Sequence, residues 1–114
     1  MDKALITVVE TKAFTAAAKG RMKPQEIDAL IDILAAEPEH GVVIQGTRGL
    51  RKIRFGVGSK GKRGSVRVVY SFYNETMPVF LLTVFAKNEK DNLSHAERNA
   101  LAKVARSLRE RYGE

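Results

Sequence analysis

Cysteine is absent from this sequence of 114 residues, and histidine occurs only twice. Without cysteine the chain has no disulfide framework, no thiolate metal site and no cysteine nucleophile. The two histidines, His40 and His95, are too few for a three-histidine metal site, so we expect no metal and no cofactor. His40 follows the end of a predicted helix, where we interpret it as structural. The apolar runs are also short, which predicts a cytoplasmic protein without a membrane partner.

Acidic residues are missing between His40 and Asn74, whereas basic residues are frequent there. The rest of the chain is close to neutral, so the net charge of +7 is concentrated in the middle third. Such a concentration favours a polyanionic ligand such as nucleic acid. The alternative is a solvated basic face that only keeps the protein soluble. We rank it second, because solubility does not require the absence of acids over so long a segment.

The order of predicted elements indicates the fold class. The length and composition suit one domain over residues 1–114. Strands are predicted at four places: 4–10, 49–55, 66–73 and 79–86. Helices are predicted at three: 11–19, 24–37 and a last one that begins after Ser94. The β-α-α-β-β-β-α order predicts an α+β fold, in which helices cover one face of a mainly antiparallel sheet.

Two predicted strands direct cations to the face of the sheet that the helices leave partly open. Successive side chains of a strand point to opposite faces, so Lys52 and Arg54 share one face of the strand 49–55. On the strand 66–73, Arg67 lies on the face opposite Tyr70. Residues 56–65, rich in glycine and basic residues, are expected to form a loop between these strands.

Familiar catalytic motifs are missing from the sequence. The segment GSKGKRGS (58–65) looks like a phosphate-binding loop, but it joins two predicted strands rather than a strand and a helix. A cluster of Lys and Arg matches one reaction, the cleavage of RNA by its own adjacent 2′-hydroxyl. Guanidinium groups bind phosphate oxygens and stabilise the charge that develops there. A basic face that binds RNA without reacting is the commoner case, and the residues alone leave both open.

Three segments of the chain resemble the RelE/HigB family of bacterial type II toxins, most closely its HigB-like subgroup. They are GLRKIRF (49–55), GKRGSVRVVY (61–70) and FLLTVFAKNEKDNLSHAE (80–97). The resemblance implies the RelE-like fold and a ribosome-dependent endoribonuclease that cuts mRNA in the ribosomal A site. It also implies a cognate antitoxin, expected to be of the helix-turn-helix type, and operator DNA that is bound only through the toxin–antitoxin complex.

The resemblance also implies roles for individual residues. By this resemblance, Lys52 is the general base, and Arg54 and Arg67 are phosphate ligands. The family's basic residue after the last strand corresponds to Lys87, and Lys90 is a further RNA contact. The family's base-stacking tyrosine near the last helix has no counterpart, so His95 or Tyr73 is expected to replace it. The other residues expected to bind RNA or the ribosome are Arg48, Arg51, Lys60, Lys62 and Arg63.

Three alternative functions remain open at this point. A ParE-like relative that poisons DNA gyrase would have the same fold, but such relatives usually lack the catalytic cations, which argues against this alternative. A non-catalytic RNA- or ribosome-binding module would need only the basic face. Repression of the toxin's own operator, as a complex with the antitoxin, is compatible with nuclease activity.

Overall fold

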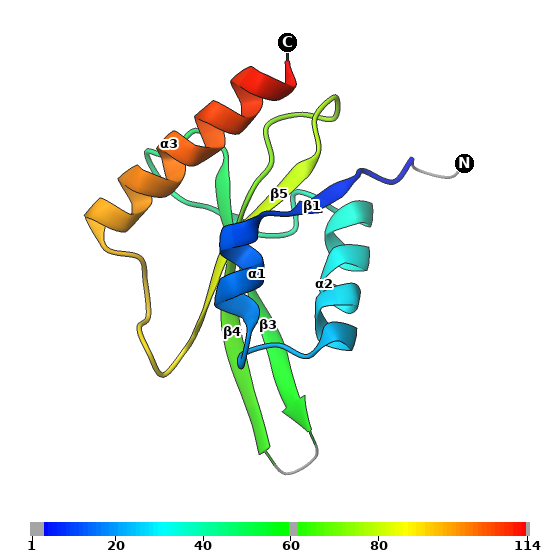
Figure 1. Cartoon of the computed structure of the whole chain (residues 1–114), viewed down its shortest axis with the longest axis vertical. Helices are drawn as coiled ribbons and strands as arrows, with labels where there is room; N and C mark the ends of the chain where they lie inside the picture. Colours follow the sequence, from blue (N-terminus) through cyan, green and yellow to red (C-terminus); the bar gives the residue numbers. More distant parts are fainter. Residues whose placement is uncertain (1–3, 60–61, 114) are drawn as a thin grey trace.

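The computed structural model describes residues 4–59 and 62–113, without the side chains of Ser59, Lys62 and Arg63. Its described part forms one five-stranded sheet in the order β1-β5-β4-β3-β2, with three helices (Figure 1). The strands are β1 (Val8–Glu10), β2 (Val42–Val43), β3 (Leu50–Ser59), β4 (Lys62–Ser71) and β5 (Val79–Ala86). The helices are α1 (Lys12–Ala18), α2 (Pro24–Ala36) and α3 (His95–Tyr112). The predicted α+β class is thereby confirmed.

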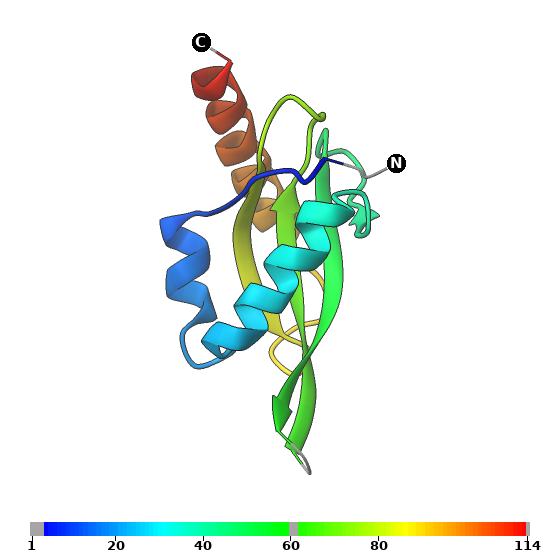
Figure 2. The ribbon, with the colours of Figure 1, turned by 90° about the vertical axis from the view of Figure 1, so that its right-hand side faces the viewer.

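The helices lie on both faces of the sheet (Figure 2). Phe14 of α1 and Leu30 of α2 belong to one buried cluster with Tyr70 of β4. Ala105 of α3 belongs to a second cluster with Phe80, on the opposite side. The prediction that all helices cover one face was therefore wrong for α3. The second face carries its own apolar residues at its upper end, and the apolar side of α3 removes them from water.

The sheet is mixed but mainly antiparallel, as predicted. Only β1 and β5 run parallel, with Val8 beside Val79, whereas β2, β3, β4 and β5 pair antiparallel. The short edge strand β2 was not predicted, because two valines do not form a recognisable pattern. Thr11 joins the sheet to the first helix: its hydroxyl caps α1 at the Phe14 amide and donates to the Leu81 carbonyl at 2.7 Å.

A two-stranded arm extends the hairpin of β3 and β4 beyond the rest of the sheet (Figure 1). The last residue of β5, Ala86, pairs with Val66, whereas the pairing of β3 with β4 continues to Ser59 and Lys62. The prediction of a loop over residues 56–65 was therefore wrong for most of that segment. Its glycines suggested a loop, but two antiparallel strands already in register extend their hydrogen-bonded ladder at little cost.

The phenol of Tyr70 fixes the segment between α2 and β2 against the sheet. Its hydroxyl donates to the Pro38 carbonyl at 2.8 Å and accepts from the Gly41 amide at 2.7 Å. A Cβ atom on Gly41 would lie 2.8 Å from the Tyr70 ring, so only glycine allows this approach. Burial raises the pKa of the Tyr70 phenol, which keeps the hydroxyl protonated. The prediction that Tyr70 is buried in the core is confirmed.

Candidate nucleic-acid interface

Lys52, Arg54 and Arg67, here called the cation cluster, lie on the sheet face opposite α1 and α2. Arg54 and Arg67 are direct cross-strand partners, and Lys52 lies two residues along β3, opposite Val69. Like charges directly opposite one another on a sheet are destabilising. A bound anion would relieve this repulsion, so the pairing favours a site for phosphate over a purely structural role.

The three cations differ in their access to solvent. Arg54 is exposed and Lys52 is half-buried, whereas only 5% of Arg67 is exposed. Arg67 Nη1 donates to Ser65 Oγ at 3.1 Å. On the neighbouring strand β5, the residue paired with Arg67 is Phe85. An anion approaching this face would therefore meet Arg54 and Lys52 first, with the charge of Arg67 beneath them.

The connecting segment (residues 87–94), between β5 and α3, reaches back to the cation cluster. Asn92 Oδ1 accepts a hydrogen bond from Lys52 Nζ at 2.6 Å. Lys90 Nζ lies 5.1 Å from the ring centre of Phe85, the β5 neighbour of Arg67. Sequence reasoning identified Lys90 but missed Asn92, because nothing local to Asn92 indicates a lysine partner forty residues away.

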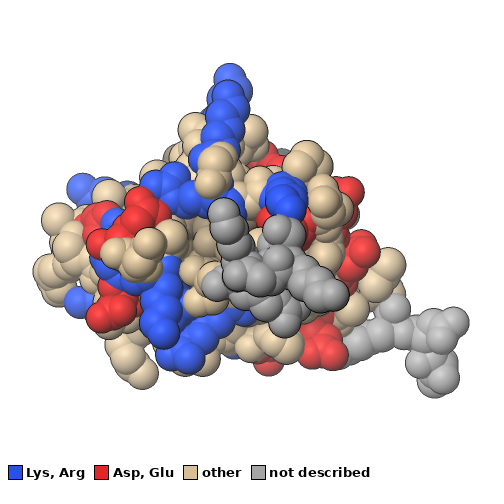
Figure 3. All heavy atoms as spheres, turned by 90° about the horizontal axis from the view of Figure 1, so that it is seen from below, with Lys and Arg blue, Asp and Glu red and all other residues tan. Residues whose placement is uncertain are grey.

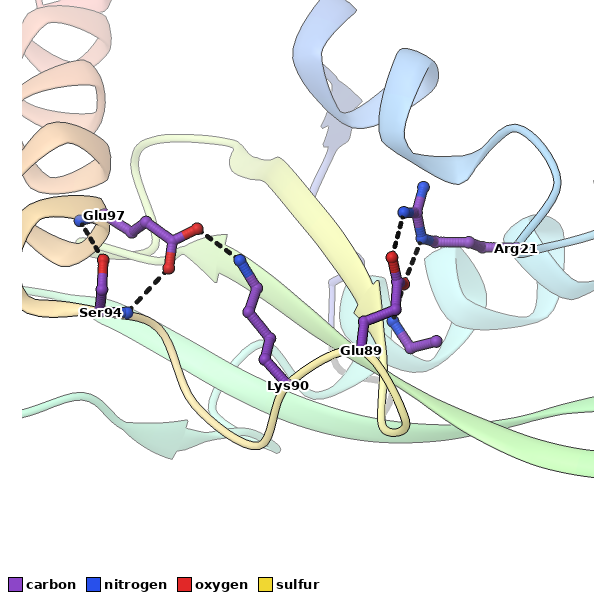
Figure 4. A network of polar contacts seen from close by, with 6 residues as sticks. Arg21, Glu89, Lys90, Ser94 and Glu97 are labelled. Atoms are coloured by element: carbon purple, nitrogen blue, oxygen red, sulfur yellow. Dashed lines mark hydrogen bonds and ion pairs between the residues drawn. The ribbon is translucent and has the colours of Figure 1, made fainter.

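Two carboxylates, those of Glu89 and Glu97, fix the connecting segment in place (Figure 4). Glu89 accepts hydrogen bonds from Arg21 Nε at 2.7 Å, from Arg21 Nη2 at 2.6 Å and from the Ala86 amide. Glu97 of α3 pairs with Lys90 and accepts from the Ser94 amide, which completes the predicted capping box. These partners lower the pKa of both carboxyl groups to about 2, so both are ionised at neutral pH.

Lys87 is the first residue of the connecting segment, and His95 directly follows its last residue. Lys87 is exposed, and its backbone amide donates to the Ser65 carbonyl at 3.1 Å, which places it next to the strand of Arg67. His95 is the first residue of α3, three residues after Asn92, and its Nδ1 lies 3.2 Å from Arg98 Nη2. The structure thus brings Lys90 and His95 to the side of the sheet where the cation cluster lies, whereas Lys87 lies at the edge of β4 beside Ser65.

Several residues with predicted RNA contacts lie elsewhere. Tyr73 packs its ring 4.8 Å from the guanidinium of Arg109, near the far end of α3 from His95. At a rise of about 1.5 Å per residue, these two ends are separated by roughly 20 Å. Arg48, with a positive φ, lies in the turn before β3, and Arg51 faces the α2 side, where Nη1 donates to the carbonyls of Glu39 and Gly41. Lys60 and the side chains of Lys62 and Arg63 lie outside the described residues.

The charge distribution seen from the hairpin end agrees with a nucleic-acid interface. In Figure 3, Lys and Arg side chains lie above and to the lower left of the centre of the view, and most acidic groups lie toward its left and right. Within residues 4–59 and 62–113, no group of three or more His, Asp or Glu side chains is placed to hold a metal ion. The same part of the chain contains no helix long and apolar enough to cross a membrane.

A comparison with protein families agrees with the observed fold. The sequence matches the family described as RelE toxin of the RelE/RelB toxin–antitoxin system over residues 7–114, which is nearly the whole chain. The match makes the protein a toxin and implies a cognate antitoxin as its partner. With its three helices, its mainly antiparallel sheet and this match, the chain belongs to the RelE toxin family.

Proposed function

We propose that this toxin is a ribosome-dependent endoribonuclease that cuts mRNA in the ribosomal A site. The observation that carries the proposal is the cation cluster, in which Arg54 and Arg67 are direct cross-strand partners and Lys52 lies beside them. Membership of the HigB-like subgroup, action in the cytoplasm and an antitoxin of the helix-turn-helix type are part of the same proposal.

The chemistry follows from what a lysine and two arginines offer to RNA. The 2′-hydroxyl of one nucleotide attacks its own 3′-phosphate, and Lys52 accepts the hydroxyl proton. Negative charge develops on the phosphorane oxygens, where Arg54 donates hydrogen bonds and Arg67 adds its charge from beneath. The bond to the 5′-oxygen breaks, and Lys87 is proposed to donate the proton to this leaving group. The products are a 2′,3′-cyclic phosphate and a 5′-hydroxyl.

Asn92 gives Lys52 a defined position for this step. Its side-chain oxygen accepts from Lys52 Nζ at 2.6 Å, and the connecting segment that carries it is held at Glu89 and Glu97. A flexible lysine held in this way loses less conformational freedom when RNA arrives. The ribosome and its mRNA supply the remaining geometry, which explains why the cation cluster alone forms an open face rather than a closed pocket.

The test is cleavage of a defined mRNA by the purified toxin, with and without translating ribosomes, mapped at single-nucleotide resolution. We expect cuts only with ribosomes, and a rate reduced about 100-fold or more in Lys52→Ala and Arg67→Ala, as when one transition-state donor is lost. Lys103→Ala, on the exposed side of α3, removes one positive charge outside the cluster and is expected to cut normally.

Other outcomes would point to the competing functions. Ribosome binding by the wild type without cleavage, and weaker binding in Lys52→Ala, would indicate a non-catalytic binding module. Inhibition of DNA supercoiling by gyrase would indicate a ParE-like poison. Either result would contradict the nuclease mechanism.

A further inference from the structure

A cavity of about 720 Å³ opens at the edge of β4, where β5 has ended and the two-stranded arm continues. Ser65 lines this cavity, and it also contacts two residues with proposed roles in cleavage. Its hydroxyl accepts from Arg67 Nη1, and its carbonyl accepts from the backbone amide of Lys87. Arg21, Val57 and Val66 place the cavity on the α1 and α2 side of the sheet. Ser65, at the edge of β4, connects it with the cation cluster on the other face. The proposed cleavage mechanism uses Lys87 from its lining but not its apolar floor.

The floor of the cavity is apolar and smooth. Val57 and Val66 line it, and the cross-strand partner of Val57 is Gly64. A Cβ atom on Gly64 would meet no heavy atom within 4 Å, so the absence of a side chain leaves open space there. Such a floor suits a flat ring, because the face of an unpaired nucleobase packs against apolar side chains.

The rim of the cavity is polar. Lys87, Asn88 and Asp91 line it from the connecting segment, and all three are exposed. Asp91 forms no ion pair with any residue that the structure describes. An unpaired carboxylate accepts hydrogen bonds from the exocyclic amino group of a base. Lys87 is placed to bind the phosphate attached to that base.

The opposite wall of the cavity is held in place by the pair of Arg21 and Glu89. Arg21 lies in the turn between α1 and α2 and lines the cavity. Its guanidinium donates to both oxygens of Glu89 and to the Ala17 carbonyl. Because these hydrogen bonds hold its guanidinium in place, we assign Arg21 to the lining of the cavity rather than to phosphate binding.

We propose that this cavity binds one nucleobase of the single-stranded RNA whose backbone contacts the cation cluster, and that it prefers a base with an amino group. The proposal rests on the proposed function in one respect, namely that the ligand is RNA. An unpaired base turned away from its neighbours offers one face to the valines and one polar edge to Asp91. Cytosine therefore fits better than uracil, which has the same ring size but no amino group.

The experiment measures fluorescence anisotropy of labelled hexamers of cytidine, of uridine and of abasic ribose-phosphate, in the absence of ribosomes. The wild type is expected to bind the cytidine hexamer about tenfold more tightly than the abasic hexamer, the size of a base-stacking effect. Gly64→Val fills the floor and should reduce this ratio to near one. Gly56→Val is the matched control, because Gly56 also has open space around it, belongs to the same arm and does not line this cavity.

A second variant tests the polar rim and does not depend on how the arm tolerates valine. Asp91→Asn exchanges one exposed side chain for another of the same shape, and it should remove the preference for cytidine over uridine. An equal affinity of the wild type for the cytidine and abasic hexamers would overturn the proposal. A ratio unchanged in Gly64→Val, or a cytidine preference retained in Asp91→Asn, would also overturn it.

The two proposals fail in different ways. A toxin that does not cut ribosome-bound mRNA but distinguishes the hexamers as described contradicts the nuclease function and supports the base-binding cavity. A toxin that cuts mRNA but binds cytidine and abasic hexamers equally supports the nuclease function and rejects the cavity.

Discussion

At the scale of single residues, Tyr70 and Arg67 on β4 are both buried but have different roles. Tyr70 is fully buried, and both hydrogen-bonding capacities of its hydroxyl are used within the protein. Arg67 is nearly as buried, yet one hydrogen bond to Ser65 is its only described side-chain contact of this kind. The first arrangement stabilises the fold, whereas the second leaves hydrogen-bond donors of a cation available next to Arg54.

The structural duty of Tyr70 leads to a prediction about stability. Tyr70→Phe leaves the Gly41 amide and the Pro38 carbonyl without their partner, and one buried unsatisfied group costs about 1–3 kcal/mol. We expect the free energy of unfolding in urea to fall by that amount, with RNA binding unchanged. Tyr73→Phe is the control, since Tyr73 is largely exposed. Equal stabilities of the two variants would show that the Tyr70 hydroxyl does not hold this segment.

At the scale of elements, the connecting segment depends on two ionised carboxylates. The partners of Glu89 and Glu97 lower the pKa of each carboxyl group from 4.5 to about 2 in the folded protein. The stabilisation is therefore complete above the unfolded pKa near 4.5 and is lost as the pH falls toward 2.

This linkage predicts acid sensitivity with an identifiable origin. We expect the urea midpoint of the wild type to fall between pH 4.5 and pH 2, and to fall less steeply in Glu89→Gln, whose amide does not titrate in this range. Glu75→Gln is the control, because Glu75 is exposed and forms no ion pair within the described part of the chain. The same slope in Glu89→Gln as in the wild type would mean that Arg21 does not stabilise the folded state through this carboxylate.

Sequence patterns predicted some elements well and others poorly, for physical reasons. The strand over 79–86 agrees with β5 residue for residue, and the capping box at Ser94 marks the start of α3, because these signals are local. The arm was predicted as a loop because its pairing depends on two segments meeting in register. The side of the sheet that α3 covers depends on the path of the connecting segment, which no periodicity encodes.

The candidate site shows the same limit. Alternation along β3 and β4 placed Lys52, Arg54 and Arg67 on one face, and the strand register confirms that placement. It also placed Arg51 on the opposite face, where its guanidinium donates to backbone carbonyls. The contact of Asn92 with Lys52 joins residues far apart in the chain, so only the folded structure contains it. The chemical roles of these residues stay predictions.

At the scale of the whole molecule, the number of phosphates that its Lys and Arg side chains neutralise determines how RNA binding responds to salt. Each phosphate neutralised on single-stranded RNA contributes about −0.7 to the slope of log affinity against log salt concentration. Arg54→Ala should therefore make the slope for the cytidine hexamer less negative by about 0.7. Lys103→Ala, on the exposed side of α3 and outside the cluster, should leave the slope unchanged. Equal slopes in the wild type and Arg54→Ala would place the RNA backbone away from the cluster.

The parallel pairing of β1 with β5 determines when, during translation, this part of the sheet can form. The hydrogen bond of Thr11 to Leu81 joins residues seventy positions apart. The first strand, β1, therefore cannot pair with β5 until most of the chain has been translated. Asn92, Lys90 and Glu97, which arrange the connecting segment over the cation cluster, are translated later still. A growing chain therefore completes this surface only after Glu97 has been translated and has left the ribosome.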